Sequence, residues 1–186
     1  MKKMMATLTL ISICVSLFAF QFRNNEWGAS QNEVMRSEGK EPVEKNNTAL
    51  SYEEVLDNME CMVLYQFLNN ELYTGAYLFI NEHSNKTLYI IDYKELKKLL
   101  IKKYGNPIKD KIKWGNDLYK DDPSSWGTAI AIGHLWYESK WKIDNTSIQL
   151  ILSGDNYKIN MGIVYINEQT NDKVKEVESK KIEDKL

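Results

Sequence analysis

The stretch YKINMGIVYI at residues 157–166 carries the clearest strand pattern in the chain. Lys158 and Asn160 alternate with apolar side chains, and successive side chains of a strand point to opposite faces of its sheet. The pattern therefore predicts a strand in a sheet that is packed on one side only. The residues expected on the packed face are Tyr157, Ile159, Met161, Ile163 and Tyr165.

Five further segments are rich in apolar, aromatic and β-branched residues and are bounded by turn residues, which predicts antiparallel strands. They cover residues 62–68, 71–80, 87–91, 130–143 and 147–152. Asn69 and Asn70 separate the first two, and asparagine tolerates the positive φ of a tight hairpin turn. Polar turns are expected at residues 81–86, 144–145 and 153–156.

Two helices are predicted from their end signals. Ser30 is a good N-cap, and Glu33 stands three positions later to complete a capping box. Gly39 followed by Pro42 supplies the stop of this first, short helix. The second helix is expected over residues 92–105, with the same kinds of residue at its ends and an amphipathic pattern between them. Its signals are Asp92, Glu95, Gly105 and Pro107.

The order capped helix, glycine, proline and antiparallel strands thus occurs twice, with Gly39 and Gly105 separated by 66 residues. We predict an α+β fold of two tandem units, each a short helix followed by an antiparallel β-meander, with the helices packed on the sheet. The alternative is a chance match of common capping residues. The predicted units are residues 20–91 and 92–166, and residues 167–186 form a charged tail that is frayed helix or flexible.

The N-terminus has the layout of a signal peptide. Lys2 and Lys3 precede an uncharged run over residues 4–22, and Ala19 is the best small residue for a cleavage point. Residues 1–19 are therefore expected to direct export to a periplasmic, cell-surface or secreted location. Two alternatives are an uncleaved membrane anchor and a lipid-modified Cys14, although Ile13 is not the small residue that lipidation requires.

Composition limits the classes of partner. The chain has 186 residues, of which 43% are hydrophobic and 27% charged, as in an ordinary globular protein. Cleavage would remove two of the 24 basic residues and change the formal charge from −2 to −4, so nucleic acid is not an expected partner. It would also leave Cys61 as the only cysteine, which excludes an intramolecular disulfide.

Two short segments share a cadence that resembles a known family. They read WGAS at 27–30 with EV at 33–34, EG at 38–39 and Pro42, and LL at 99–100 with YGNP at 104–107. They resemble the small lipoprotein of the outer-membrane β-barrel assembly machinery (SmpA/OmlA type) and the tandem-repeat β-lactamase-inhibitor-protein-like fold. They are also similar to uncharacterised exported bacterial proteins. The resemblance implies helices packed on an antiparallel sheet, in a module that binds envelope proteins and catalyses no reaction.

Catalytic and cofactor motifs are not found in the sequence. The two histidines, His83 and His134, stand in no Cys/His cluster, so no metal site is predicted. Glycine-rich phosphate loops and a serine elbow are also missing, so we expect no cofactor. Glu138 follows His134 by four residues, about 13 Å along a strand, which is too far for direct proton transfer. Glu138 and Asp155 are the carboxylates that a hydrolase would use.

Tryptophans provide the candidate binding residues. Trp126 lies in the predicted loop 121–127, and Trp114 lies a short distance before it. Exposed indole rings suit a sugar or peptide surface because they offer a large contact area. The alternative is that aromatic residues fill the core, as expected for Tyr137 and Trp141.

The predicted function is an exported, non-enzymatic module that binds an envelope protein or a cell-wall component. Two alternatives are a cell-wall or surface hydrolase and a membrane-anchored extracytoplasmic sensor, and the second brings the membrane in as a partner only if the signal segment stays uncleaved. A binding module is expected to present an exposed aromatic patch or a conspicuous concave sheet face.

Overall fold

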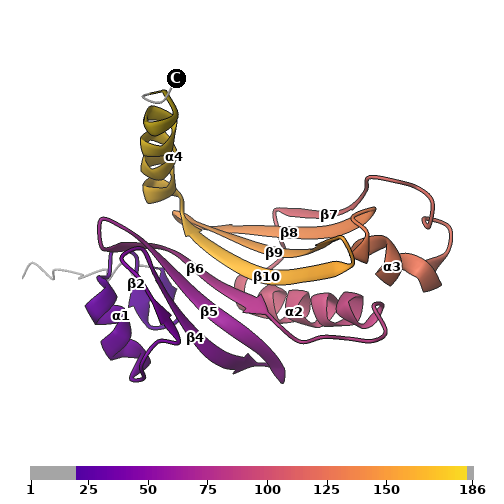
Figure 1. The fold of residues 1–186 in the computed structure, drawn as a ribbon, viewed down its shortest axis with the longest axis horizontal. Helices are drawn as coiled ribbons and strands as arrows, with labels where there is room; N and C mark the ends of the chain where they lie inside the picture. The colour runs from indigo at the N-terminus through magenta and orange to yellow at the C-terminus, as the bar shows by residue number, and fades with distance from the viewer. Residues whose placement is uncertain (1–19, 184–186) are drawn as a thin grey trace, which may run out of the picture.

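A computed structural model describes residues 20–183, with side chains through Lys175, and the predicted signal peptide lies outside these residues. The described part is an α+β fold made mostly of sheet (Figure 1). Eight antiparallel strands form one sheet in the order β3-β4-β5-β6-β10-β9-β8-β7. They are β3 (Glu44–Lys45), β4 (Ala49–Leu56), β5 (Met59–Leu68), β6 (Glu71–Phe79), β10 (Lys158–Asn167), β9 (Thr146–Asp155), β8 (Leu135–Ile143) and β7 (Lys109–Trp114).

The first helix has the predicted ends. Helix α1 (Gln31–Glu38) begins after Ser30, whose side chain accepts from the Glu33 amide while the Glu33 carboxylate accepts from the Ser30 amide. Gly39 ends the helix with a φ of 66°, a left-handed conformation that glycine adopts without a steric penalty. The capping box and the glycine stop are therefore confirmed.

The start of the second helix differs from the prediction. Helix α2 (Leu88–Tyr104) begins after Thr87, so the predicted strand 87–91 and the Asp92 cap are wrong. Tyr89 and Ile90 are buried and extend the helical repeat of the later core residues by one turn, so packing outweighs the strand preference of this apolar run. Asp92 instead pairs with His83, at 2.5 Å from Nε2 to Oδ2.

Three other predicted boundaries are corrected. The predicted strand 130–143 begins only at Leu135, because the preceding residues form helix α3 (Trp126–Ala131) and a turn. Residues 153–155 belong to β9, so the turn before β10 is Asn156 and Tyr157. Tyr157 therefore lies in that turn, 72% exposed, and not on the packed face. Strand β4 was missed because its Ser-Tyr-Glu-Glu centre lacks a simple alternation.

One face of the sheet, which we call the covered face, carries the core. Buried and half-buried residues alternate along β5 and β8, as expected for a sheet packed on one side. Helices α1 and α2 and the short hairpin of β1 (Gln21–Phe22) and β2 (Asn25–Glu26) pack against this face. Its most buried residues include Leu50, Val63, Tyr65, Tyr137, Trp141, Ile148, Leu150, Leu152 and Ile163.

The N-terminal segment joins the two halves of the sheet. The Phe22 ring lies 5.3 Å from the Tyr65 ring and 5.1 Å from the Tyr165 ring, between centroids, so it contacts β5 and β10 together. Trp27 Nε1 donates to Thr146 Oγ1 at 2.8 Å, which links the start of the described chain to β9. Packing from residues 20–29 therefore stabilises both halves.

A buried polar chain holds α2 on the second half of the sheet. The Tyr93 hydroxyl donates to Ser139 Oγ at 2.7 Å, and Ser139 donates to Asp110 Oδ1 at 2.7 Å. Tyr93 and Ser139 are both almost fully buried. This burial is the main reason why the pKa of the Tyr93 hydroxyl is raised. The chain therefore connects α2, β8 and β7 through a neutral phenol and an ionised carboxylate.

Replacing Ser139 with alanine is expected to lower the free energy of unfolding by about 1–3 kcal/mol, because the buried Tyr93 hydroxyl loses its acceptor. Urea denaturation followed by tryptophan fluorescence measures the change. Ser153→Ala, on the half-exposed side of β9, is the matched control and should stay within about 0.5 kcal/mol of the wild type. Equal losses in the two variants would contradict the role of this polar chain.

The segment after Asn167, expected as a charged tail, forms helix α4 (Glu168–Glu183). Figure 1 shows α4 rising from the end of β10, on the side of β8–β10 opposite to α2. Lys142 Nζ lies 2.6 Å from a Glu168 carboxylate oxygen and ties the base of the helix to β8. Among residues 20–183, no helix combines the length and the apolar content needed to cross a bilayer.

Candidate binding surface

The second face of the sheet, which we call the open face, has no layer of α1, α2 or the N-terminal hairpin over it. Along β5 and β8 its side chains alternate with the buried ones and are half-buried or exposed, whereas the smaller Ser51, Thr74, Ala76 and Ser147 on neighbouring strands are buried. Helix α4 stands at one end of this face, beside Gln149 and Ile166. The open face is therefore the largest region of sheet that the described chain leaves without a covering layer.

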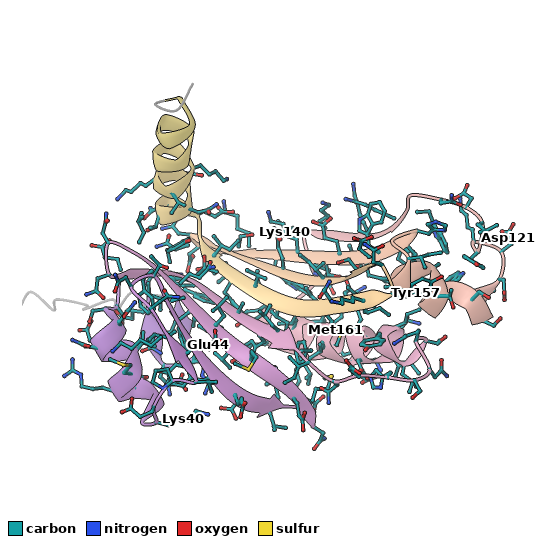
Figure 2. The ribbon with its side chains drawn as sticks, in the orientation of Figure 1. Lys40, Glu44, Asp121, Lys140, Tyr157 and Met161 are labelled. Atoms are coloured by element: carbon teal, nitrogen blue, oxygen red, sulfur yellow. The ribbon has the colours of Figure 1, made fainter. Side chains whose placement is uncertain are left out.

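Strand registers place the residues of the open face in rows that cross the sheet. One complete row joins all eight strands, with Glu44 and Lys140 near its two ends (Figure 2). The next row runs in the same direction from Glu53 to Lys111. The complete row is Glu44, Ser51, Leu64, Ala76, Val164, Gln149, Lys140 and Lys109.

Charge changes sign along these rows. We call the side of β3–β5 the glutamate end, the middle strands the apolar centre, and the side of β7–β8 the lysine end. The glutamate end consists of Glu44, Glu53 and Glu60. The apolar centre consists of Met62, Leu64, Ala76, Leu78, Ile151 and Val164. The lysine end consists of Lys109, Lys111, Lys113, Lys140 and Lys142. The open face thus combines an apolar middle with oppositely charged ends.

An open depression of about 490 Å³ lies where the lysine end meets the apolar centre. Trp136 lies in its wall, and Lys113 Nζ is 5.8 Å from the centroid of the indole ring. This distance is within the range of a cation–π contact. Glu138, Ile151 and Ser153 complete the lining. An aromatic ring, an ion pair and an aliphatic side chain suit contact with a peptide or a protein surface.

Glu138 is a carboxylate that lies between two lysines of this end. Lys109 Nζ lies 2.6 Å and Lys113 Nζ 3.4 Å from its Oε2 atom. The hydrogen bond from Lys109 is the main cause of the lowered pKa of Glu138. Burial acts in the opposite direction, and a hydrogen bond from Lys113 lowers the pKa further. Glu138 is therefore ionised at neutral pH and does not serve as a general acid.

The lowered pKa predicts a pH-dependent effect of Glu138→Gln. A carboxylate with a depressed pKa stabilises the fold above its ordinary pKa, and this contribution is lost as the pH falls through the lowered value. The variant should lose about 0.2–1 kcal/mol at neutral pH, and this difference from the wild type should disappear once the pH is below the lowered pKa of Glu138. Urea denaturation across this range, with Glu71→Gln as the control, measures it. A loss that persists at low pH would show a packing effect.

The predicted tryptophans lie together, but outside the open face. Trp114 ends β7 and pairs with the buried Leu135, on the covered side of the sheet, and Trp126 is the first residue of α3 and not part of a loop. Their rings meet edge to face with centroids 5.8 Å apart, and Trp126 Nε1 donates to the Lys120 carbonyl at 3.1 Å. Both are half-buried, so their role as binding residues stays a prediction.

The predicted carboxylates and histidines form no common site. Asp155 lies on the open face four residues beyond Ile151, the partner of Glu138, which places the two carboxylates about 13 Å apart along the strands. His83 pairs with Asp92 at the start of α2, and His134 packs beside Tyr119 with ring centroids 6.2 Å apart. No three metal-ligating side chains gather anywhere in the part of the chain that the structure describes.

Cys61 is buried on the covered face, and burial raises the pKa of its thiol. A thiol in this state is a poor nucleophile, since reaction requires the thiolate. Cys61 therefore acts as a small buried hydrophobe.

Sequence reasoning identified the sheet but not the open face. The alternation along β8 predicted that Tyr137 and Trp141 are buried. The residues that alternate with them, which include Trp136 and Glu138, lie on the open face. The missing signal was strand order, since only pairing across β6 and β10 brings the glutamates and lysines into shared rows.

No family model, curated protein or solved structure matches the chain.

Proposed function

We propose that this protein is an exported, non-enzymatic module of the cell envelope that binds another protein molecule through its open face. The single observation that carries the proposal is the open face itself: an eight-stranded sheet with α1 and α2 packed on its other side, and an apolar centre that α4 borders at one end. Leu78 is 41% exposed there, and Met62, Ile151 and Val164 are half-buried. Apolar patches of this kind, bordered by charge, are typical of protein interfaces.

Export is the part of the proposal that rests on residues 1–19. Lys2, Lys3, the uncharged run and Ala19 support a cleaved signal peptide. N-terminal sequencing of the protein recovered from its own cells tests this step. A mature chain that starts near Phe20 is expected, and an intact Met1 would instead indicate an anchored protein. The outcome for binding does not depend on this measurement.

We also propose that the sheet arose from two tandem units. Strands β5 and β9 each have 10 residues, and their first residues, Met59 and Thr146, lie 87 positions apart. The tight turns that follow, at 69–70 and 156–157, keep the same spacing. This 87-residue spacing is larger than the 66-residue spacing of Gly39 and Gly105. The extra residues of the second unit lie in its first strand, β7, which is longer than β3, and in residues 115–134, which precede β8 and contain α3. Chance matching of cap residues does not account for a shared strand spacing.

Site-specific photo-crosslinking tests binding by the open face. A photoreactive amino acid at Ile151 is expected to capture a protein in living cells, because this side chain is part of the apolar centre. Lys94, exposed on α2 away from the open face, is the matched control position. Capture from Ile151 that exceeds capture from Lys94 supports the proposal. Equal capture at both positions, or none at Ile151, would overturn it.

A further inference from the structure

We infer that the outer edge of strand β7 binds an extended segment of a partner protein as an added strand, with acidic residues on one face of that segment and apolar residues on the other. Strand β7 is the last in the sheet order, and no described strand pairs with its outer side. The inference goes beyond the proposed function, because it concerns the edge of the sheet and not the apolar centre of the open face. Added strands bind through main-chain hydrogen bonds, and their alternate side chains give specificity.

The backbone of β7 leaves a row of hydrogen-bonding groups on this edge. In an antiparallel pair, residues that exchange hydrogen bonds with the neighbouring strand alternate with residues whose N–H and C=O groups point away from it. The Gly115 amide donates to the His134 carbonyl at 2.8 Å, and these two residues continue the register of β7 with β8. Counted back in twos, the odd-numbered residues of β7 face β8. The N–H and C=O groups of Asp110, Ile112 and Trp114 therefore point outward.

Charge on the open-face side of β7 favours an acidic segment. Lys109, Lys111 and Lys113 lie on this side at every second position of the strand. Lys109 and Lys113 share the carboxylate of Glu138, whereas Lys111 forms an ion pair with no described residue, so positive charge is in excess here. Carboxylates at every second position of an added strand would lie directly beside these lysines. Opposite charges on neighbouring strands stabilise their pairing.

The covered side of the same strand offers apolar contacts. Ile112 is 55% exposed although its partner on β8, Tyr137, is buried, because the sheet ends beside Ile112. Trp114 follows two residues later on the same side, and its ring meets the Trp126 ring with centroids 5.8 Å apart. An apolar side chain on the added strand would cover Ile112 and remove its surface from water. The two tryptophans predicted to bind a partner thus border the inferred contact.

A second copy of this chain does not fit the edge. Two β7 edges joined antiparallel would set lysines beside lysines, and like charges on neighbouring strands oppose pairing. The other edge of the sheet, β3, has two residues and cannot cover a strand of six. Lysines on an edge strand protect it from indiscriminate pairing, and here they restrict pairing to a segment that carries carboxylates at the matching spacing.

A synthetic peptide of four glutamate–valine repeats, blocked at both ends, tests the inference on protein purified from cells that express the full chain. Amide hydrogen exchange followed by NMR should show fast exchange of the Ile112 amide in the protein alone, and exchange at least about 10-fold slower with the peptide bound. The Lys113 amide, which faces β8, should be protected in both states. Protection of the Ile112 amide in the protein alone that rises with protein concentration would assign the edge to a second copy and overturn the inference.

Ile112→Pro removes the outward N–H group, and an edge strand tolerates proline where that group faces solvent. Fluorescence anisotropy of the labelled peptide should show at least about 10-fold weaker binding to this variant, because the added strand loses a main-chain hydrogen bond and meets the proline ring. Ile112→Val keeps the N–H group and, as the matched control, should bind as the wild type does. Circular dichroism checks the folding of both variants, and the exchange measurement on the wild type does not depend on them.

Three results would each overturn the inference. The first is full binding by a folded Ile112→Pro variant, which would mean that the peptide contacts the lysines without joining the sheet. The second is equal binding of a lysine–valine peptide of the same length, which would remove the role of charge. The third is no binding of the glutamate–valine peptide up to about 1 mM.

Discussion

Replacing Arg23 with alanine is expected to lower the free energy of unfolding by about 3–5 kcal/mol, because it leaves the buried Glu38 carboxylate without its counter-charge. Arg23 Nε donates to Glu38 Oε1 at 2.8 Å, and its Nη2 atom donates to Glu54 at 3.0 Å. The Glu38 side chain is only 4% exposed and also accepts from the Tyr65 hydroxyl. The loss is therefore far larger than for an exposed ion pair.

Burial opposes the positive charge on Arg23, but Glu38 and the neighbouring tyrosine hydroxyls outweigh it and raise the pKa of the guanidinium. Burial and the hydrogen bond to Glu38 raise the pKa of Tyr65 in turn. The cluster is thus a charged arginine, an ionised glutamate and a neutral phenol, and it connects the turn after β1 to α1 and β5. Loss of Arg23 should weaken all three attachments together.

Urea denaturation measures the effect, with Arg36→Ala as the control in the last turn of α1, where the exposed guanidinium donates to the Asn32 carbonyl at 3.4 Å. Arg36→Ala should cost less than about 1 kcal/mol. The double variant Arg23→Ala/Glu38→Gln should be more stable than Arg23→Ala, because it removes the unpaired charge. An Arg23→Ala loss as small as that of the control would show that solvent compensates Glu38.

Gly75→Val should produce the second large loss, about 3 kcal/mol or more, since no side chain fits at this position. A β-carbon on Gly75 would lie 2.1 Å from Phe22 Cδ1, and Phe22 is only 2% exposed. The ring cannot move aside, because the rings of Tyr65, Tyr77 and Tyr165 surround it at 5.1 to 5.5 Å between centroids. The substitution must therefore displace β1 from its packing against the covered face of the sheet.

Thermal unfolding compares this variant with Gly162→Ala on the adjacent strand β10. A β-carbon there would meet the Tyr77 carbonyl at 3.0 Å and Leu78 Cδ2 at 3.3 Å, a milder contact with a flexible side chain on one side. Combining Gly75→Val with Phe22→Ala should cost less than the sum of the single losses, because the removed ring leaves room for valine. Additive losses would place the strain in the β6 backbone and not against Phe22.

Local sequence signals determined those parts of the fold that depend on neighbouring residues. Ser30 and Glu33 close a capping box within one helical turn, and Asn69 and Asn70 adopt the positive φ values expected of a tight hairpin. The alternation at Met161, Ile163 and Tyr165 likewise identified a buried strand face. These features follow from backbone sterics and from the two-residue period of a strand, both of which act over a few residues.

Tertiary packing decided the features that depend on distant partners. Residues 87–91 have the composition of a strand, yet Tyr89 and Ile90 gain more by burial on a helix, and Trp126 joins a helix through the packing of α3 on β9. The candidate surface is of the same kind. Glu44 and Lys140 stand 96 positions apart, and only the pairing of β6 with β10 places them in one row of the open face. Sequence alone therefore located the first helix cap, the Asn69–Asn70 turn and the buried face of β10, whereas the order of the strands, a long-range choice made by packing, determined what surface they form.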